Sequence, residues 1–89
     1  MSYVYLLCDH EEHGPENLMA TTDRNRLQPM LEEWASHRFL GSLSIDDERK
    51  ALGALLSTMS DDEMIKQGGE FRLGVGWGSL QLHVVRLYT

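Results

Sequence analysis

The sequence predicts an α+β fold, in which a small antiparallel or mixed sheet of three or four strands carries two or three helices on one face. The chain opens with a short run of aromatic and branched apolar residues, and its middle places apolar residues at spacings of three and four. Its last twenty residues alternate with a period of two. The element order is therefore strand, strand, helices, strand, strand, within a single domain of residues 1–89.

Two strands are predicted at the start of the chain. Residues 3–9, YVYLLCD, place apolar side chains on both faces of a strand, which suits a central strand better than an edge. The segment HEEHGPE at 10–16 interrupts this run, and Gly14-Pro15 is a turn signal. Residues 17–21, NLMAT, then form a short second strand that returns beside the first.

The first helix follows the capping residues Thr22 and Asp23. Apolar residues then recur at the spacing of one helical face: Leu27, Met30, Leu31 and Trp34. Pro29 fits the first turn of a helix but disrupts its interior. Two starting points are therefore compatible with the sequence. Either the helix begins near Gln28, or a short turn at 23–27 bends into it.

Two further helices follow Gly41, which ends the first. The motif SIDD at Ser44–Asp47 is a variant of the capping box, and an apolar stripe follows it: Leu52, Leu55, Leu56 and Met59. Ser60 and Glu63, in SDDE, form a complete capping box that opens a short third helix. Gly68-Gly69 ends that helix.

The last part of the chain predicts two strands joined by a turn near Gly78-Ser79. In residues 71–77, apolar side chains alternate with Arg72 and glycines, and residues 80–88, LQLHVVRLY, form the final strand. The glycines leave bare backbone on one face of the strand, which an aromatic ring of a neighbouring strand or a second chain can cover. We favour the internal ring, because a bare groove is costly in a soluble monomer.

The composition argues against several functions. A formal charge of −6 disfavours direct binding to nucleic acid, which needs clustered Lys and Arg, and disfavours anionic membranes. The single cysteine, Cys8, indicates a reducing compartment. No apolar run approaches the roughly 18 residues of a membrane helix, and the start lacks a secretory leader. We therefore expect a cytoplasmic protein that binds a protein with a basic surface.

The densest group of metal-binding side chains follows the first predicted strand. Cys8, His10 and His13 are suitable ligands for zinc or copper, and a fourth would come from His83 or from the acids beside His10. The spacing matches no strong metal signature. In the alternative interpretation, Cys8 is a small buried apolar residue and the histidines lie in a solvated loop. We expect no metal and no cofactor.

Catalysis is not predicted either. Cys8 with His10 or His83 would make a thiol–imidazole pair, but two residues on one strand face point in parallel. The acids of an exposed loop keep ordinary pKa values, whereas catalytic acids need burial or a close charge. The sequence therefore assigns no catalytic residue.

The segment from Tyr3 to Trp34 resembles the opening of small uncharacterised proteins encoded by phages and bacteria. The shared features are a VYLL-type strand, an acidic loop, a second strand and a helix entered through a cap, here TTDRNRL. This resemblance covers about a third of the chain and implies an α+β fold and an accessory role in phage or mobile-element biology. Pro29 and the glycine-rich strand at 74–78 depart from the pattern, and no catalytic residue carries over.

We interpret the chain as a small acidic protein-binding module without catalysis. The predicted surface combines the open face and edge of the sheet with the acidic loop at 9–16, through these residues: Tyr3, Tyr5, Glu11, Glu12, Arg72, Trp77 and His83. Apolar contacts would form the centre, and the acids would steer a basic partner. An unpaired strand edge can also pair with its own copy, which would give a homodimer.

Two alternatives stay open. An acidic inhibitor that mimics the charge of nucleic acid would use the same acids. A metal-binding protein or metal-dependent enzyme would use Cys8, His10 and His13.

Overall fold

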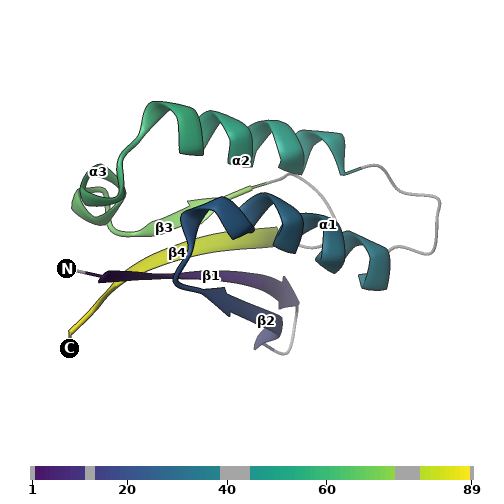
Figure 1. Cartoon of the computed structure of the whole chain (residues 1–89). Coiled ribbons are helices and arrows are strands. Elements are labelled where there is room, and N and C mark those ends of the chain that lie inside the picture. Colours follow the sequence, from purple (N-terminus) through teal and green to yellow (C-terminus); the bar gives the residue numbers. More distant parts are fainter. Residues whose placement is uncertain (1, 12–13, 39–44, 74–78, 89) are drawn as a thin grey trace.

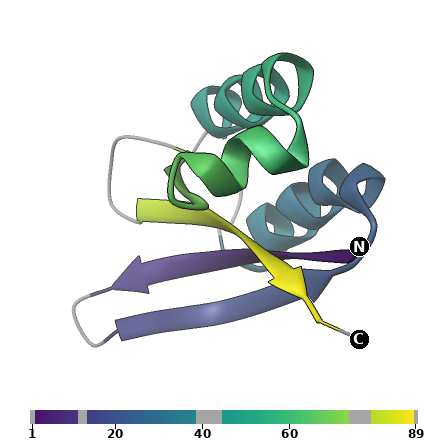
Figure 2. The ribbon, with the colours of Figure 1, turned by 90° about the vertical axis from the view of Figure 1, so that its left-hand side faces the viewer.

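The computed structural model describes residues 2–11, 14–38, 45–73 and 79–88. The elements, in chain order, are β1 (Ser2–Glu11), β2 (Gly14–Thr21), the 3-10 turn η1 (Arg24–Arg26), α1 (Leu27–Arg38), α2 (Asp46–Thr58), α3 (Asp61–Lys66), β3 (Glu70–Arg72) and β4 (Ser79–Leu87). In these ranges the strands form one antiparallel sheet of order β2-β1-β4-β3, and the helices lie over one of its faces (Figures 1 and 2). The predicted α+β fold and its element order are confirmed.

The structure combines the two predicted starts of the first helix, since a short turn precedes a helix that begins close to Gln28. Asp23 caps η1, and its carboxylate accepts a hydrogen bond from the Asn25 N–H at 3.0 Å. This short turn leads directly into α1, which begins at Leu27. Pro29 is then the third residue of α1. Proline is tolerated there, because an N–H in the first turn has no partner within the helix.

The predicted capping box of the third helix is present. The Ser60 hydroxyl accepts a hydrogen bond from the Glu63 N–H at 3.3 Å, and the Glu63 carboxylate accepts one from the Ser60 N–H at 3.4 Å. The predicted cap at Ser44 lies outside the described residues, and α2 follows Ile45, which makes no side-chain cap.

Gly69 ends α3 for a steric reason. Its φ angle is +71°, and a Cβ built there would lie 2.5 Å from the carbonyl oxygen of Val84. The Val84 N–H donates a hydrogen bond to the Gly69 carbonyl at 2.8 Å, so the two backbones meet closely. Only glycine combines this φ angle with this approach.

The core lies between the helices and one face of the two central strands. Tyr5 pairs with Val84 and Leu7 with Leu82 across β1 and β4, and all four side chains are at most 3% exposed. The helices contribute buried side chains that include Leu27, Leu31, Trp34, Leu52 and Met64. Each fully buried side chain of this size stabilises the fold by about 1.5–3 kcal/mol, so this layer supplies most of the driving force for folding.

Arg24 fastens the helical layer at one end. Its guanidinium donates hydrogen bonds of 2.6 Å to the carbonyls of Leu56 and Met59, at the end of α2, and pairs with the Asp61 carboxylate at 2.7 Å. The last carbonyls of a helix have no partner within the helix, so these bonds satisfy groups that folding would otherwise leave unpaired. One side chain thereby joins η1, the end of α2 and the start of α3.

Replacing Arg24 by Ala should lower the free energy of unfolding by roughly 2–3 kcal/mol, because hydrogen bonds from a charged donor contribute about 1.5–3 kcal/mol. Urea unfolding followed by tryptophan fluorescence and circular dichroism measures the change. Arg26→Ala is the matched control, since the Arg26 side chain is 75% exposed, and it should change stability by less than about 0.5 kcal/mol. Equal losses in both variants would show that Arg24 has no special role.

Candidate functional site

The face of the sheet opposite the helices carries no described helix (Figures 1 and 2). We call it the open face. Alternation along the strands places these described residues on it: Ser2, Val4, Leu6 and Cys8 of β1, Ala20 of β2, Glu70 and Arg72 of β3, and Gln81, His83, Val85 and Leu87 of β4. Its centre, on β1 and β4, is largely apolar.

Apolar exposure on the open face increases toward the end of β4. Cys8 is only 4% exposed, whereas Val85 is 44% and Leu87 38% exposed, and Tyr88 directly after the strand is 82% exposed. These three are the exposed large apolar side chains in the ranges that the structure describes. Val85 pairs with Val4, so the exposed patch continues onto β1.

Polar groups border this apolar centre on the side of β3. The imidazole Nε2 of His83 lies 3.1 Å from the Gln81 Oε1 atom, and its Nδ1 lies 3.6 Å from a carboxylate oxygen of Glu70. The contact with Glu70 becomes an ion pair when the imidazole is protonated. Both ring nitrogens of His83 therefore face neighbours on β3 and β4, and across the ladder His83 pairs with Leu6 and not with Cys8.

Two of the predicted contact residues lie on the covered face of the sheet instead of the open face. Tyr5 is 3% exposed beneath the helices, and the half-buried Tyr3 donates a hydrogen bond from its hydroxyl to Asp62. Placing Tyr3 and Tyr5 on the open face was wrong, because they share a strand face with Leu7, which belongs to the core. Arg72 and His83 do lie on the open face.

Several predicted site residues fall outside what the structure describes. Trp77, Glu12 and His13 lie outside the described residues, as do the side chains of His10 and Glu11. The predicted metal set therefore stays untested, apart from Cys8, which is buried. Among the residues that the structure does describe, no three His, Cys, Asp or Glu side chains lie close enough to hold a metal ion.

The acids whose side chains are described lie mainly on the helices. Glu32 and Glu33 belong to α1, and the first turns of α2 and α3 hold three acids each: Asp46, Asp47 and Glu48, then Asp61, Asp62 and Glu63. Arg49 pairs with two of them, since its guanidinium lies 2.8 Å from carboxylate oxygens of both Glu32 and Asp46. The helical layer is therefore acidic, while the described charges of the open face include both signs.

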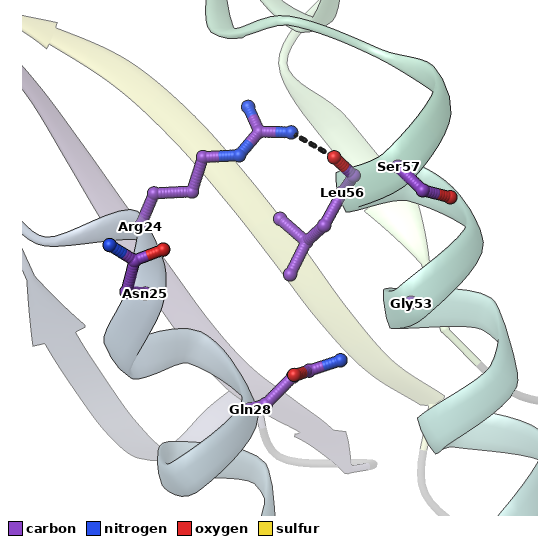
Figure 3. A pocket seen from close by; sticks show the side chains of 6 residues that line it. All are labelled: Arg24, Asn25, Gln28, Gly53, Leu56 and Ser57. Atoms are coloured by element: carbon purple, nitrogen blue, oxygen red, sulfur yellow. Dashed lines mark hydrogen bonds between the residues drawn. The ribbon is translucent and has the colours of Figure 1, made fainter.

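A groove runs between the start of α1 and α2, and sequence reasoning missed it. It has a volume of about 330 Å³ and is lined by Arg24, Asn25, Gln28, Gly53, Leu56 and Ser57. Figure 3 shows the Arg24 guanidinium crossing one end to the Leu56 carbonyl and the Gln28 amide extending toward Gly53. A smaller hollow of about 160 Å³ continues past Gln28 to Arg49.

Gly53 is the sequence signal that could have indicated this groove. It lies in the middle of α2, where glycine is about 0.5–1 kcal/mol less favourable than alanine. A Cβ added there would meet only the Gln28 Nε2 atom, at an ordinary contact distance of 3.8 Å. The groove is lined by neutral amides and a hydroxyl, and its arginine is already paired with Asp61, so it offers hydrogen bonds but no acid–base chemistry.

Comparison of the chain with protein-family models, curated proteins and solved structures found no match in any of the three. The resemblance of its opening segment to phage proteins therefore stays a prediction. In the described ranges, each helix is too short or too polar to cross a membrane.

The environment of Tyr5 makes the free energy of unfolding depend on pH in the alkaline range. Burial raises the pKa of the Tyr5 hydroxyl above its ordinary value of 10.0, and a hydrogen bond to Asp61 acts in the same direction. The folded protein then holds this proton more tightly than the unfolded chain does. The resulting stabilisation is complete below pH 10 and is lost as the pH rises above it.

We therefore expect the free energy of unfolding to fall between pH 10 and pH 12, and to fall less steeply in Tyr5→Phe. Urea unfolding at closely spaced pH values measures both slopes. Identical slopes for the two proteins would contradict a role for the Tyr5 proton.

Proposed function

We propose that this protein is a protein-binding module that acts without catalysis, and that its contact surface is the open face. The observation that carries this proposal is the exposure of Val85 and Leu87 on a face that no described helix covers. Contiguous exposed apolar surface on a small protein marks an interaction site.

The composition of the open face supports the proposal. Apolar side chains of β1 and of the second half of β4 form its apolar part, while His83 of β4 and Glu70 and Arg72 of the edge strand β3 lie beside it. Protein interfaces have this arrangement, with an apolar centre that excludes water and a polar rim that fixes orientation.

The net charge supports a partner with a basic surface. A charge of −6 on 89 residues creates a negative field that accelerates encounter with a basic protein, even where the acids lie outside the contact. The single cysteine and the resemblance of the opening segment support a cytoplasmic, accessory role.

A charge placed in the open face should abolish binding, whereas the same charge on the helices should not. Val85→Lys introduces a cation into the apolar centre, and Ala54→Lys introduces one on the exposed side of α2. With each variant as bait in an extract of the source cells, quantitative mass spectrometry should show at least about tenfold less captured partner for Val85→Lys, a loss of about 1.4 kcal/mol.

Equal capture by the two variants would remove the open face from the site. Circular dichroism and the urea midpoint check that both variants are folded.

The acidic layer favours a second candidate, an inhibitor that mimics nucleic-acid charge. Six of the eight acids on the helices lie in first turns, where negative charge stabilises a helix by about 0.3–1 kcal/mol each, so folding already explains most of their positions. Capture that decreases steeply with salt and is unaffected by Val85→Lys would support this inhibitor. A stoichiometric zinc ion that is lost in Cys8→Ser would instead support the metal-binding alternative.

A further inference from the structure

We propose that a second copy of this chain covers the open face, so that two sheets pack face to face around a twofold axis lying between them. This inference rests on the proposed function only in taking the open face as the contact surface, because it replaces the basic partner with a second copy of the acidic chain. Four features of the structure support it: the pattern of the central strands, the distribution of charge, the strand edges and the size of the face.

β1 is apolar on both faces from Tyr3 to Cys8, and β4 is apolar on both faces in its second half, after the polar Gln81 and His83 of the open face. Tyr5, Leu7, Leu82 and Val84 fill the covered face, yet Val4, Leu6, Val85 and Leu87 occupy the open one. A sheet with one solvated face alternates apolar and polar residues, whereas apolar residues on both faces are typical of strands with a layer on each side. The described helices supply one layer, and no described element supplies the second.

The distribution of charge suits a second copy of the chain. In the described ranges, Glu70 and Arg72 on the open face have opposite charges, while the helices hold eight acids. Two copies packed through their open faces keep the helical layers roughly 30 Å apart, with packed layers about 10 Å from each other. Because the Debye length is about 8 Å in physiological salt, repulsion between the acidic layers is screened.

The strand edges suit a second copy less well than the face does. β2 forms one edge of the sheet, and Pro15 near its start cannot donate a backbone hydrogen bond. β3 forms the other edge and is only three residues long. One edge thus lacks a donor near its start and the other is short, so we favour the face over the edge-paired homodimer that the sequence suggested.

The open face is large enough for a specific dimer. The strands have 10, 8, 3 and 9 residues. A rise of about 3.3 Å per residue and a strand spacing of about 4.8 Å then give roughly 500 Å² for each copy, before the relief of the side chains is added. Two copies reach the lower limit of specific interfaces, at about 1,000–1,200 Å², so we expect a dissociation constant in the micromolar range.

Sedimentation equilibrium of the full chain, from about 5 μM to about 1 mM, tests the proposal across this range of affinity. We expect the wild-type mass to double with concentration. Val85→Lys should weaken the dimer at least tenfold, because each copy would bury an unpaired cation in the interface, and Ala54→Lys should leave it unchanged. Leu87→Lys, at the end of β4, serves as a second open-face variant if Val85→Lys does not fold.

A wild-type protein that stays monomeric at the highest concentration would overturn the dimer. A dimer that persists in folded Val85→Lys or Leu87→Lys would also overturn it, because the interface would then lie elsewhere. If the wild type is monomeric but Val85→Lys still loses a captured partner, the dimer is wrong and the proposed function holds. If Val85→Lys changes neither the sedimentation mass nor the amount of captured partner, the dimer and the proposed function of the open face are both wrong.

Discussion

The guanidinium of Arg24 holds together three segments that lie far apart in the sequence. It binds carbonyls of Leu56 and Met59 and the carboxylate of Asp61, while Tyr3 hydrogen-bonds to Asp62 in the same first turn of α3. These contacts fix the corner between α2 and α3 over one face of the sheet. These contacts hold the described helices on that side of the sheet, opposite the face that carries the exposed Val85 and Leu87.

Local signals predicted the elements well, because caps and turns act over a few residues. The Ser60–Glu63 capping box and the Gly68-Gly69 stop are both present, and their N–H groups bond to partners within five residues in the chain. Arg24 gave no such signal. Its partners are 32 to 37 residues away, and nothing in the residues around it distinguishes it from the exposed Arg26.

The face of each central strand was harder to predict than the strand itself. β1 is apolar at both odd and even positions, so the alternation that normally identifies the buried face was absent. Tyr3 and Tyr5 were therefore placed on the wrong face, although the strand and its central position were right. Gly53 shows a related limit, since a glycine in mid-helix draws attention to its position, but only the structure shows that Gln28 of α1 lies opposite it.

The apolar character of β1 on both faces admits two physical explanations, and the structure separates them. A central position gives a strand neighbours on its two sides, but these neighbours satisfy backbone hydrogen bonds and do not bury side chains above or below the sheet. Burial of both faces requires two layers, and the described helices provide one. The exposed Val85 and Leu87 are therefore not explained by β4 being central, and their burial against a further layer over the open face would contribute free energy that the described elements leave unused.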